Sequence, residues 1–133
     1  MNKSEMFVKT PTDVTAIIRA ELPKEQKEER VFVLPLDANG KVLAKPILVS
    51  VGHQDGTTAI DAGSIFREAL KVGAEEIIVT HNHPSGNLTP SKADIEATRK
   101  LRQVSELLNV PLLDHLVLGV DGAFESMAEQ GIA

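Results

Sequence analysis

Apolar residues recur along the chain with two periods, and these periods predict its helices and strands. Three segments carry apolar side chains three or four residues apart, the spacing that places them on one face of a helix. We expect these helices at residues 10–22, 62–72 and 89–108. Shorter runs rich in Val, Ile and Leu predict strands. We expect these strands at residues 31–36, 42–44 continued by 47–51, 77–80, 112–118 and 123–127.

Capping and turn residues predict several boundaries of these elements. Thr10 can cap the first helix, and Gly73 and Asn109 can end the second and the third. The Asn-Gly pair at 39–40 is typical of a hairpin turn after the first strand. Pro46 interrupts the pairing that follows, which indicates a sheet edge or a bulge. Polar loops are expected at residues 52–58 and 81–89.

The same spacing predicts which helical side chains face the core. They are Ile65, Phe66, Ala69 and Leu70 on the second helix, and Ile95, Thr98, Leu101, Val104 and Leu108 on the third. The element order is helix, strand, strand, helix, strand, helix, strand, strand. This order predicts an α/β chain of mixed α+β type, with one central mixed sheet and helices packed on it. The length of 133 residues suggests a single domain over residues 1–133.

Composition and charge narrow the classes of function. The chain has 14 basic and 19 acidic residues and a formal charge of −5, whereas nucleic-acid binders are more often basic. It contains no Tyr or Trp that would stack on single-stranded bases. Both observations argue against direct DNA binding by this domain. The absence of Cys excludes disulfides and thiolate zinc sites.

The sequence also gives an expectation for location. No apolar run approaches the roughly 20 residues that a membrane-spanning helix needs. The first five residues lack the apolar core of a signal peptide. We therefore expect a cytoplasmic protein that does not contact a membrane, and the sequence leaves its oligomeric state open.

The segment from His81 to Asp94 is where ligand types, spacing and local structure agree on one chemistry. His81 and His83 are two residues apart, so in an extended segment both rings project to the same side. Asp94 falls early in the following helix, and Ser91, three residues before it, shares its face. Two imidazoles, one carboxylate and a vacant fourth position make the catalytic form of a tetrahedral zinc site. A lone His-x-His pair more often binds no metal, so the hypothesis depends on the joint pattern.

Hydrolysis at such a site also needs a carboxylate that moves protons. Zinc lowers the pKa of its water to about 7, and a nearby carboxylate can take the proton and pass it to the leaving amine. The candidates are Glu28 and Glu29, just before the first strand. Both belong to the charged run at residues 24–30, whose other interpretation is a solvated surface segment.

Three further polar residues have two interpretations each. His115 follows Asp114 in a predicted strand, and this pair is more often structural, with an orienting role for His115 on a ligand histidine as the alternative. His53 is either an exposed loop residue or the border of a substrate groove. Asn82 can fix the shape of its loop by hydrogen bonding. The adjacent letters His-Asn-His do not indicate an HNH nuclease, because that name describes residues dispersed over a ββα-metal unit.

The order and spacing of these residues resemble a known motif. The pattern Glu29 … His81-x-His83-x7-Ser91-x2-Asp94 is similar to the JAMM motif of the MPN metalloprotease superfamily. His-Asn-His-Pro-Ser-Gly at 81–86 and Leu-Leu-Asp-His at 112–115 resemble more narrowly its RadC-like branch. The resemblance covers nearly all of the chain from about residue 10. Full-length members usually begin with a helix-hairpin-helix module that is not seen here, so we expect a stand-alone member or a piece of a longer protein.

The resemblance implies a fold, a reaction and roles for residues. The fold would be a curved sheet flanked by helices, the cytidine-deaminase-like arrangement. His81, His83 and Asp94 would be zinc ligands, Glu29 the general acid/base, and Ser91 a hydrogen-bond donor to the oxyanion or the scissile carbonyl. If the motif is aligned one residue earlier, Glu28 takes the role of general acid/base instead of Glu29. The reaction would be hydrolysis of a peptide or isopeptide bond in a protein or peptide substrate.

Two other functions stay open at this point. A non-catalytic interaction domain in a DNA-processing context is the first, because the sequence shows no substrate pocket; superfamily members of this kind have often lost ligand residues that this chain keeps. A metal-dependent nuclease is the second, although the sequence contains no basic groove. The DNA-repair label attached to the RadC-like branch gives weak support to either.

Overall fold

The computed structural model describes residues 6–52 and 60–132, and its elements follow the predicted order. In chain order they are α1 (Pro11–Arg19), β1 (Glu29–Leu36), β2 (Ile47–Gly52), α2 (Ala62–Lys71), β3 (Glu76–Asn82), α3 (Lys92–Leu108), β4 (Leu112–Leu118) and β5 (Phe124–Ser126). The predicted fold class, a mixed α/β sheet flanked by helices, is confirmed. No helix among these described residues is long and apolar enough to cross a membrane.

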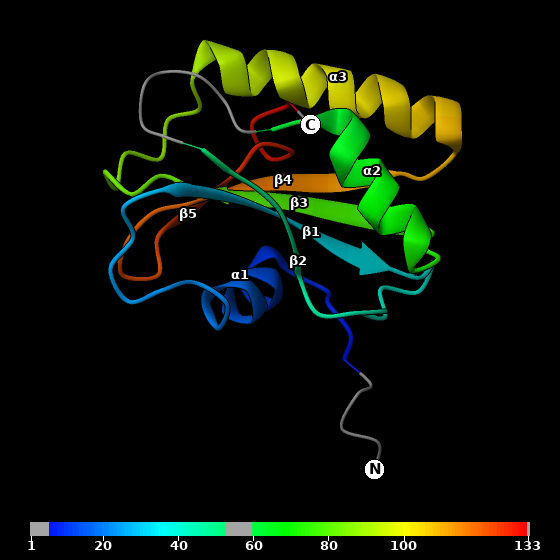
Figure 1. Ribbon diagram of the computed structural model, residues 1–133, viewed down its shortest axis with the longest axis horizontal. Coiled ribbons are helices and arrows are strands. Elements are labelled where there is room, and N and C mark those ends of the chain that lie inside the picture. The colour runs from blue at the N-terminus through cyan, green and yellow to red at the C-terminus, as the bar shows by residue number, and fades with distance from the viewer. Residues whose placement is uncertain (1–5, 53–59, 133) are drawn as a thin grey trace.

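One twisted sheet organises the described part of the chain. Its strand order is β2-β1-β3-β4-β5; β3 and β4 run parallel, and every other neighbouring pair is antiparallel. Figure 1 shows α2 and α3 on one face of the sheet and α1 on the other. The sheet is therefore covered on both sides, and its central strands are buried on both faces.

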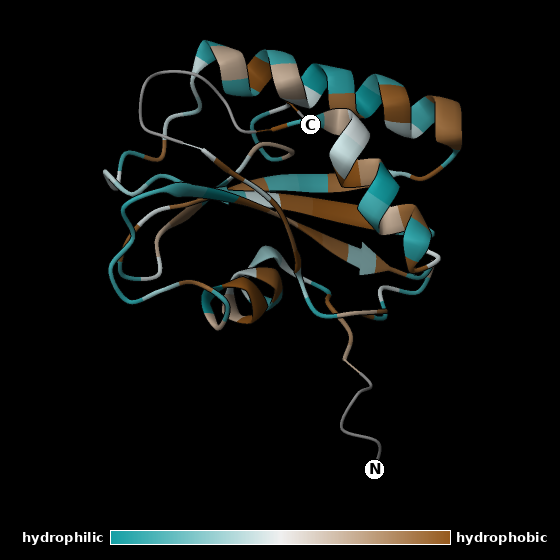
Figure 2. Ribbon diagram, in the orientation of Figure 1, coloured by the Kyte–Doolittle hydropathy of each residue, from teal (hydrophilic) through white to brown (hydrophobic). Residues whose placement is uncertain are grey.

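The alternation of side chains along β1 divides the core into two layers. Val31 and Val33 face α2 and α3, and Phe32, Leu34 and Leu36 face α1. Successive residues of a strand project to opposite faces of the sheet, so one continuous apolar run supplies both layers. Figure 2 shows hydrophobic residues concentrated in these central strands, and hydrophobic and hydrophilic residues alternating along α3.

Several element ends differ from the predicted ones because long-range pairing or capping decides them. The first strand begins at Glu29 rather than at residue 31, because Glu29 pairs with Gly52 of β2. β3 continues through Asn82 rather than ending at residue 80, since its last residues pair with β4. α3 begins at Lys92 rather than at residue 89, because Ser91 caps it.

The first helix is shorter than predicted, although its start is as expected. Thr10 caps α1, accepting a hydrogen bond from the backbone N–H of Asp13, whose side chain bonds back to the cap. The helix ends at Arg19 rather than at residue 22, and tight turns bond Glu21 to Ile18 and Leu22 to Arg19.

Most residues of the predicted inner faces are buried, but Ile95 and Val104 are only half-buried and two leucines are exposed. Thr98 and Leu101 are fully buried, and α2 buries Ile65, Phe66 and Ala69 as expected. Leu70 is 48% exposed and Leu108 is 43% exposed. Leu70 lies one position beyond the buried face of α2, and Leu108 lies in the last turn of α3, immediately before Asn109 ends that helix in a left-handed conformation.

β2 lies at the sheet edge, as Pro46 predicted. Residues 42–44 form no strand and contribute only the isolated bridge of Val42 to Leu36. The bulge lies at Val49 rather than at Pro46, because the register shifts there between the pairs of Phe32 with Leu48 and Val31 with Ser50. Most of the predicted loop at 52–58, including His53, lies outside the described residues.

Candidate metal centre

Four side chains, from β1, from β3 and the segment that follows it, and from α3, meet at one end of the sheet. Glu29 opens β1, His81 is the penultimate residue of β3, His83 follows that strand, and Asp94 lies in the first turn of α3. Each offers one ligand atom, and these atoms all lie within 4.8 Å of one another. Antiparallel pairing sets Val31 opposite His81, which brings Glu29, two residues earlier, to the end of β3 on the same face.

The histidine nitrogens and the Asp94 carboxylate form the tightest part of the cluster. The Nε2 atoms of His81 and His83 are 2.9 Å apart. Asp94 Oδ2 lies 3.3 Å from the first and 3.2 Å from the second. Glu29 Oε1 stands farther away, at 4.0 Å from His81 Nε2 and 3.6 Å from His83 Nε2. The structure thus brings together His81, His83 and Asp94 closely, with Glu29 beside them.

A backbone carbonyl orients the ring of His83. Its Nδ1 lies 2.6 Å from the carbonyl oxygen of Asn87, which can only accept, so Nδ1–H donates this bond. The neutral ring then keeps its lone pair on Nε2, which faces the cluster. The turn at 83–87 is closed by the bond of Gly86 N–H to the His83 carbonyl, and Gly86 adopts φ +85° there.

Asp94 is held by the start of its own helix. Its backbone N–H donates to Ser91 Oγ at 3.0 Å, and its Oδ2 accepts from the Ser91 N–H at 3.0 Å. Burial alone would raise the pKa of Asp94, but the contacts with His81 and His83 outweigh it and hold that pKa far below its usual range. The hydrogen bond to Asp94 in turn raises the pKa of His83, against the opposing effect of burial. Asp94 is therefore an anion at neutral pH.

The donor set fits a divalent metal ion. A tetrahedral zinc with ligand bonds of about 2.0–2.1 Å separates its ligand atoms by about 3.3 Å, close to the edges formed by His81, His83 and Asp94. Two imidazole nitrogens and a carboxylate converge here in a largely buried place, where a cation would balance the negative charge of the carboxylate. The cluster can hold a metal ion, with Glu29 next to it.

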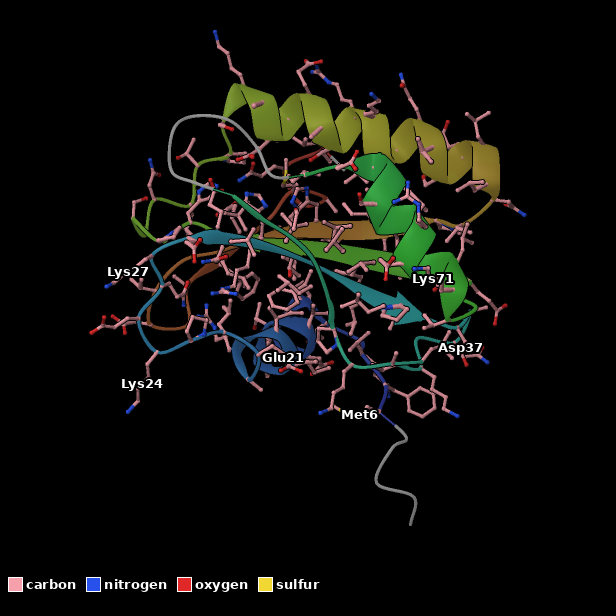
Figure 3. All side chains as sticks on the ribbon, in the orientation of Figure 1. Met6, Glu21, Lys24, Lys27, Asp37 and Lys71 are labelled. Carbon is pink, nitrogen blue, oxygen red and sulfur yellow. The ribbon has the colours of Figure 1, made fainter. Side chains whose placement is uncertain are left out.

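The structure separates the two neighbouring glutamates. Glu29 directs Oε1 to the histidines, whereas the Glu28 carboxylate lies 3.8 Å from the Arg30 guanidinium and is partly exposed. Within the charged run, Lys24, Glu25 and Lys27 are exposed, as its other interpretation expects, and Figure 3 shows Lys24 and Lys27 projecting away from the molecule. Of the two candidates, only Glu29 is brought to the cluster.

Asp114 and His115 do not pair through their side chains. Asp114 accepts hydrogen bonds from Ser126 Oγ at 2.6 Å and from two backbone N–H groups, and so ties β4 to the segment after β5. His115 is fully buried and contacts His81 instead, with Nε2 of His115 2.7 Å from Nδ1 of His81. Burial lowers the pKa of His115 well below its usual range, so its ring is neutral.

The sequence interpretation missed Thr98 as a member of this environment. Thr98 Oγ1 lies 2.7 Å from His115 Nδ1, on the side of that ring away from His81. The available signal was a hydroxyl residue at an inward helical position, four residues after Asp94. Asn82 has a different place: it projects from the opposite face of β3 and bonds the segment that leads into β1.

Comparison with known proteins agrees with this arrangement. A family model described as the RadC-like JAB domain matches residues 8–132. A UPF0758 protein of Thermosynechococcus vestitus is 38% identical over 125 residues, which are 94% of this chain and 48% of that relative. A UPF0758 protein of Trichormus variabilis is 43% identical over 124 residues, 91% of this chain and 50% of the relative. A third, from Clostridium perfringens, is 35% identical over 129 residues, 97% of this chain and 55% of the relative. The chain spans about half the length of the curated relatives it matches.

Proposed function

Because the chain belongs to the RadC-like JAB domain family, we propose that it is a zinc-dependent hydrolase that cleaves a peptide or isopeptide bond. One observation carries the proposal: two imidazole nitrogens, one buried carboxylate oxygen and a second carboxylate converge at the end of β3. The family membership by itself specifies neither the metal nor the reaction, and both are part of this proposal.

Ligand chemistry supports zinc as the ion. Imidazole suits zinc and the later transition metals, whereas magnesium and calcium prefer sites made of oxygen alone. His81, His83 and Asp94 would hold the ion, and three protein ligands with one open position are typical of catalytic zinc sites. When bound, zinc lowers the pKa of a coordinated water to about 7 and polarises the scissile carbonyl.

Glu29 and Ser91 would supply the remaining chemistry. Glu29 Oε1, beside both histidines but farther out than Asp94, can accept the proton of the attacking water and deliver it to the leaving nitrogen. Ser91 Oγ accepts the Asp94 N–H, which leaves its hydroxyl proton free to donate to the oxygen that gains charge. Ser91 is exposed and therefore accessible to a substrate.

The test measures metal content and turnover in the same preparations. We expect about one zinc per chain by elemental mass spectrometry, and hydrolysis in a panel of peptide and isopeptide substrates. Glu29→Gln should keep the zinc and lose turnover. Glu28→Gln is the matched control, since it removes the neighbouring charge outside the cluster, and should keep both.

Other outcomes would favour other functions. Turnover that persists in Glu29→Gln would refute the role of Glu29. Zinc without hydrolysis of any substrate would favour an interaction domain, and metal-dependent cleavage of plasmid or oligonucleotide would favour a nuclease. The protein or peptide substrate and the cytoplasmic location remain predictions.

A further inference from the structure

We propose that His115 and Thr98 are positioning residues that hold the ring of His81 in the tautomer whose unprotonated Nε2 faces the cluster and can bind a metal ion. The proposal rests on the metal site proposed above and names the residues that prepare it. Neither residue belongs to the cluster that offers ligand atoms. Both are fully buried, His115 in β4 and Thr98 in α3.

A continuous chain of hydrogen bonds joins two of the proposed ligands through these residues. The Thr98 hydroxyl donates to the backbone carbonyl of Asp94 at 2.8 Å. Thr98 Oγ1 and His115 Nδ1 are 2.7 Å apart, and His115 Nε2 and His81 Nδ1 are also 2.7 Å apart. The chain therefore starts at the backbone of Asp94 and ends at the ring of His81.

The Asp94 carbonyl, the acceptor at the start of this hydrogen-bond chain, determines which atom donates in each of its bonds. The Thr98 hydroxyl donates its single proton to the Asp94 carbonyl, which can only accept, and the Thr98 oxygen is then left to accept from His115 Nδ1. The sulfur of Met127, 3.7 Å from the same hydroxyl, is likewise an acceptor and cannot reverse this. A neutral His115 that donates from Nδ1 must accept at Nε2, and its partner there is the Nδ1–H of His81.

The result is a His81 ring whose Nε2 lone pair faces the cluster. With Nδ1 protonated, neutral His81 has no proton on Nε2, the atom that lies 3.3 Å from Asp94 Oδ2. The reverse direction would turn the Thr98 hydroxyl to His115, put the His115 proton on Nε2 and place the His81 proton on its own Nε2. That arrangement blocks metal binding and removes the side-chain donor from the Asp94 carbonyl.

Groups that orient a ligand histidine in this way act on metal affinity. Loss of such a partner typically weakens metal binding about 10–100-fold. Thr98→Val replaces the hydroxyl by a methyl group of similar shape, so it removes the proton acceptor of His115 and leaves the packing of α3 nearly unchanged. Thr98→Ser is its matched control, because it keeps the hydroxyl.

A second pair of variants tests the ring itself. His115→Phe fills the same space without nitrogens, and His115→Gln offers an amide oxygen near the place of Nε2, which can accept the His81 proton. We expect zinc affinity, measured by competition with a chelator, to fall about 10–100-fold in Thr98→Val and His115→Phe. It should stay near the wild-type value in Thr98→Ser and His115→Gln.

A measurement on the metal-free wild-type protein tests the proposal even if a variant fails to fold or the protein fails to bind zinc. Long-range proton–nitrogen NMR of the metal-free wild-type protein at pH 8 should show His115 protonated at Nδ1. Protonation of His115 at Nε2 would overturn the proposal, and so would wild-type zinc affinity in Thr98→Val. If the wild type binds no zinc, the proposed function fails, and the tautomer of His115 still decides the present inference.

Discussion

The side-chain oxygen of Asn82 accepts a hydrogen bond from the backbone N–H of Arg30, with the two atoms 2.6 Å apart. The amide nitrogen of Asn82 donates to the Gln26 side chain at 2.9 Å and to the Glu28 carbonyl at 3.0 Å. Asn82 is only 1% exposed. The residue between the two histidines therefore fixes, from the opposite face of β3, the segment that carries Glu29.

Replacing Asn82 should separate catalysis from metal binding. Asn82→Leu leaves the Arg30 N–H and the Glu28 carbonyl without their partner, at a cost of about 1–3 kcal/mol in the free energy of unfolding. The released segment moves Glu29, and a displacement of about 1 Å can lower the catalytic rate about 100-fold. Zinc content should stay at the wild-type level. Elemental analysis and peptide turnover measure the two effects.

Gln26→Met provides the matched control for Asn82. It removes a single bond at the partly exposed end of the same network, so turnover should change little. Loss of zinc in Asn82→Leu, or a larger loss of turnover in Gln26→Met, would contradict this account of how Glu29 is placed.

Ser91 has a structural and a proposed catalytic role, and one substitution separates them. Gly is nearly as good a helix cap as Ser, so Ser91→Gly should lower the free energy of unfolding by only a few tenths of a kcal/mol, roughly. Loss of its hydroxyl donor should lower the rate of hydrolysis about 10²–10³-fold. Ser91→Thr keeps the hydroxyl and should keep activity. Equal turnover in Ser91→Gly and the wild type would remove the catalytic role.

Metal affinity should depend on pH through His83. Its Nδ1–H donates to Asn87, so a proton on Nε2 competes directly with a metal ion. Because Asp94 raises the pKa of His83 above 6.5, this competition begins at a higher pH than for a free histidine. Affinity should be constant above the pKa of His83 and fall about tenfold per pH unit below it. Chelator competition between pH 8 and 6 measures it, and a flat profile would contradict it.

The two faces of α3 should respond differently to truncation. Leu101 is fully buried in the core cluster between the sheet and its helices, so Leu101→Ala should lower the free energy of unfolding by about 2–5 kcal/mol. Leu107 is 86% exposed, and Leu107→Ala should stay within about 0.5 kcal/mol of the wild type. Urea unfolding gives both values. Similar values for the two variants would show that the helix packs by another face.

Much of the fold and part of the site were predictable from local sequence. Helical and strand periods predicted every element in its right order, and Thr10 and Asn109 predicted helix ends. His81 and His83 share a face because residues two apart in an extended segment do, and Ser91 lies beside Asp94 because the cap of a helix bonds the third residue after it. Such relations depend only on local backbone geometry, which residues close together in the sequence determine.

Only the tertiary structure decided which distant groups meet. Nothing local distinguishes Glu29 from Glu28; the pairing of Val31 with His81 does, because one step of register turns a side chain to the other face. Likewise, the parallel register that sets Val79 opposite His115 turned an ambiguous Asp-His pair into a contact with His81. The sequence determined the elements and the ligand types, and strand register, which no short segment encodes, determined their neighbours.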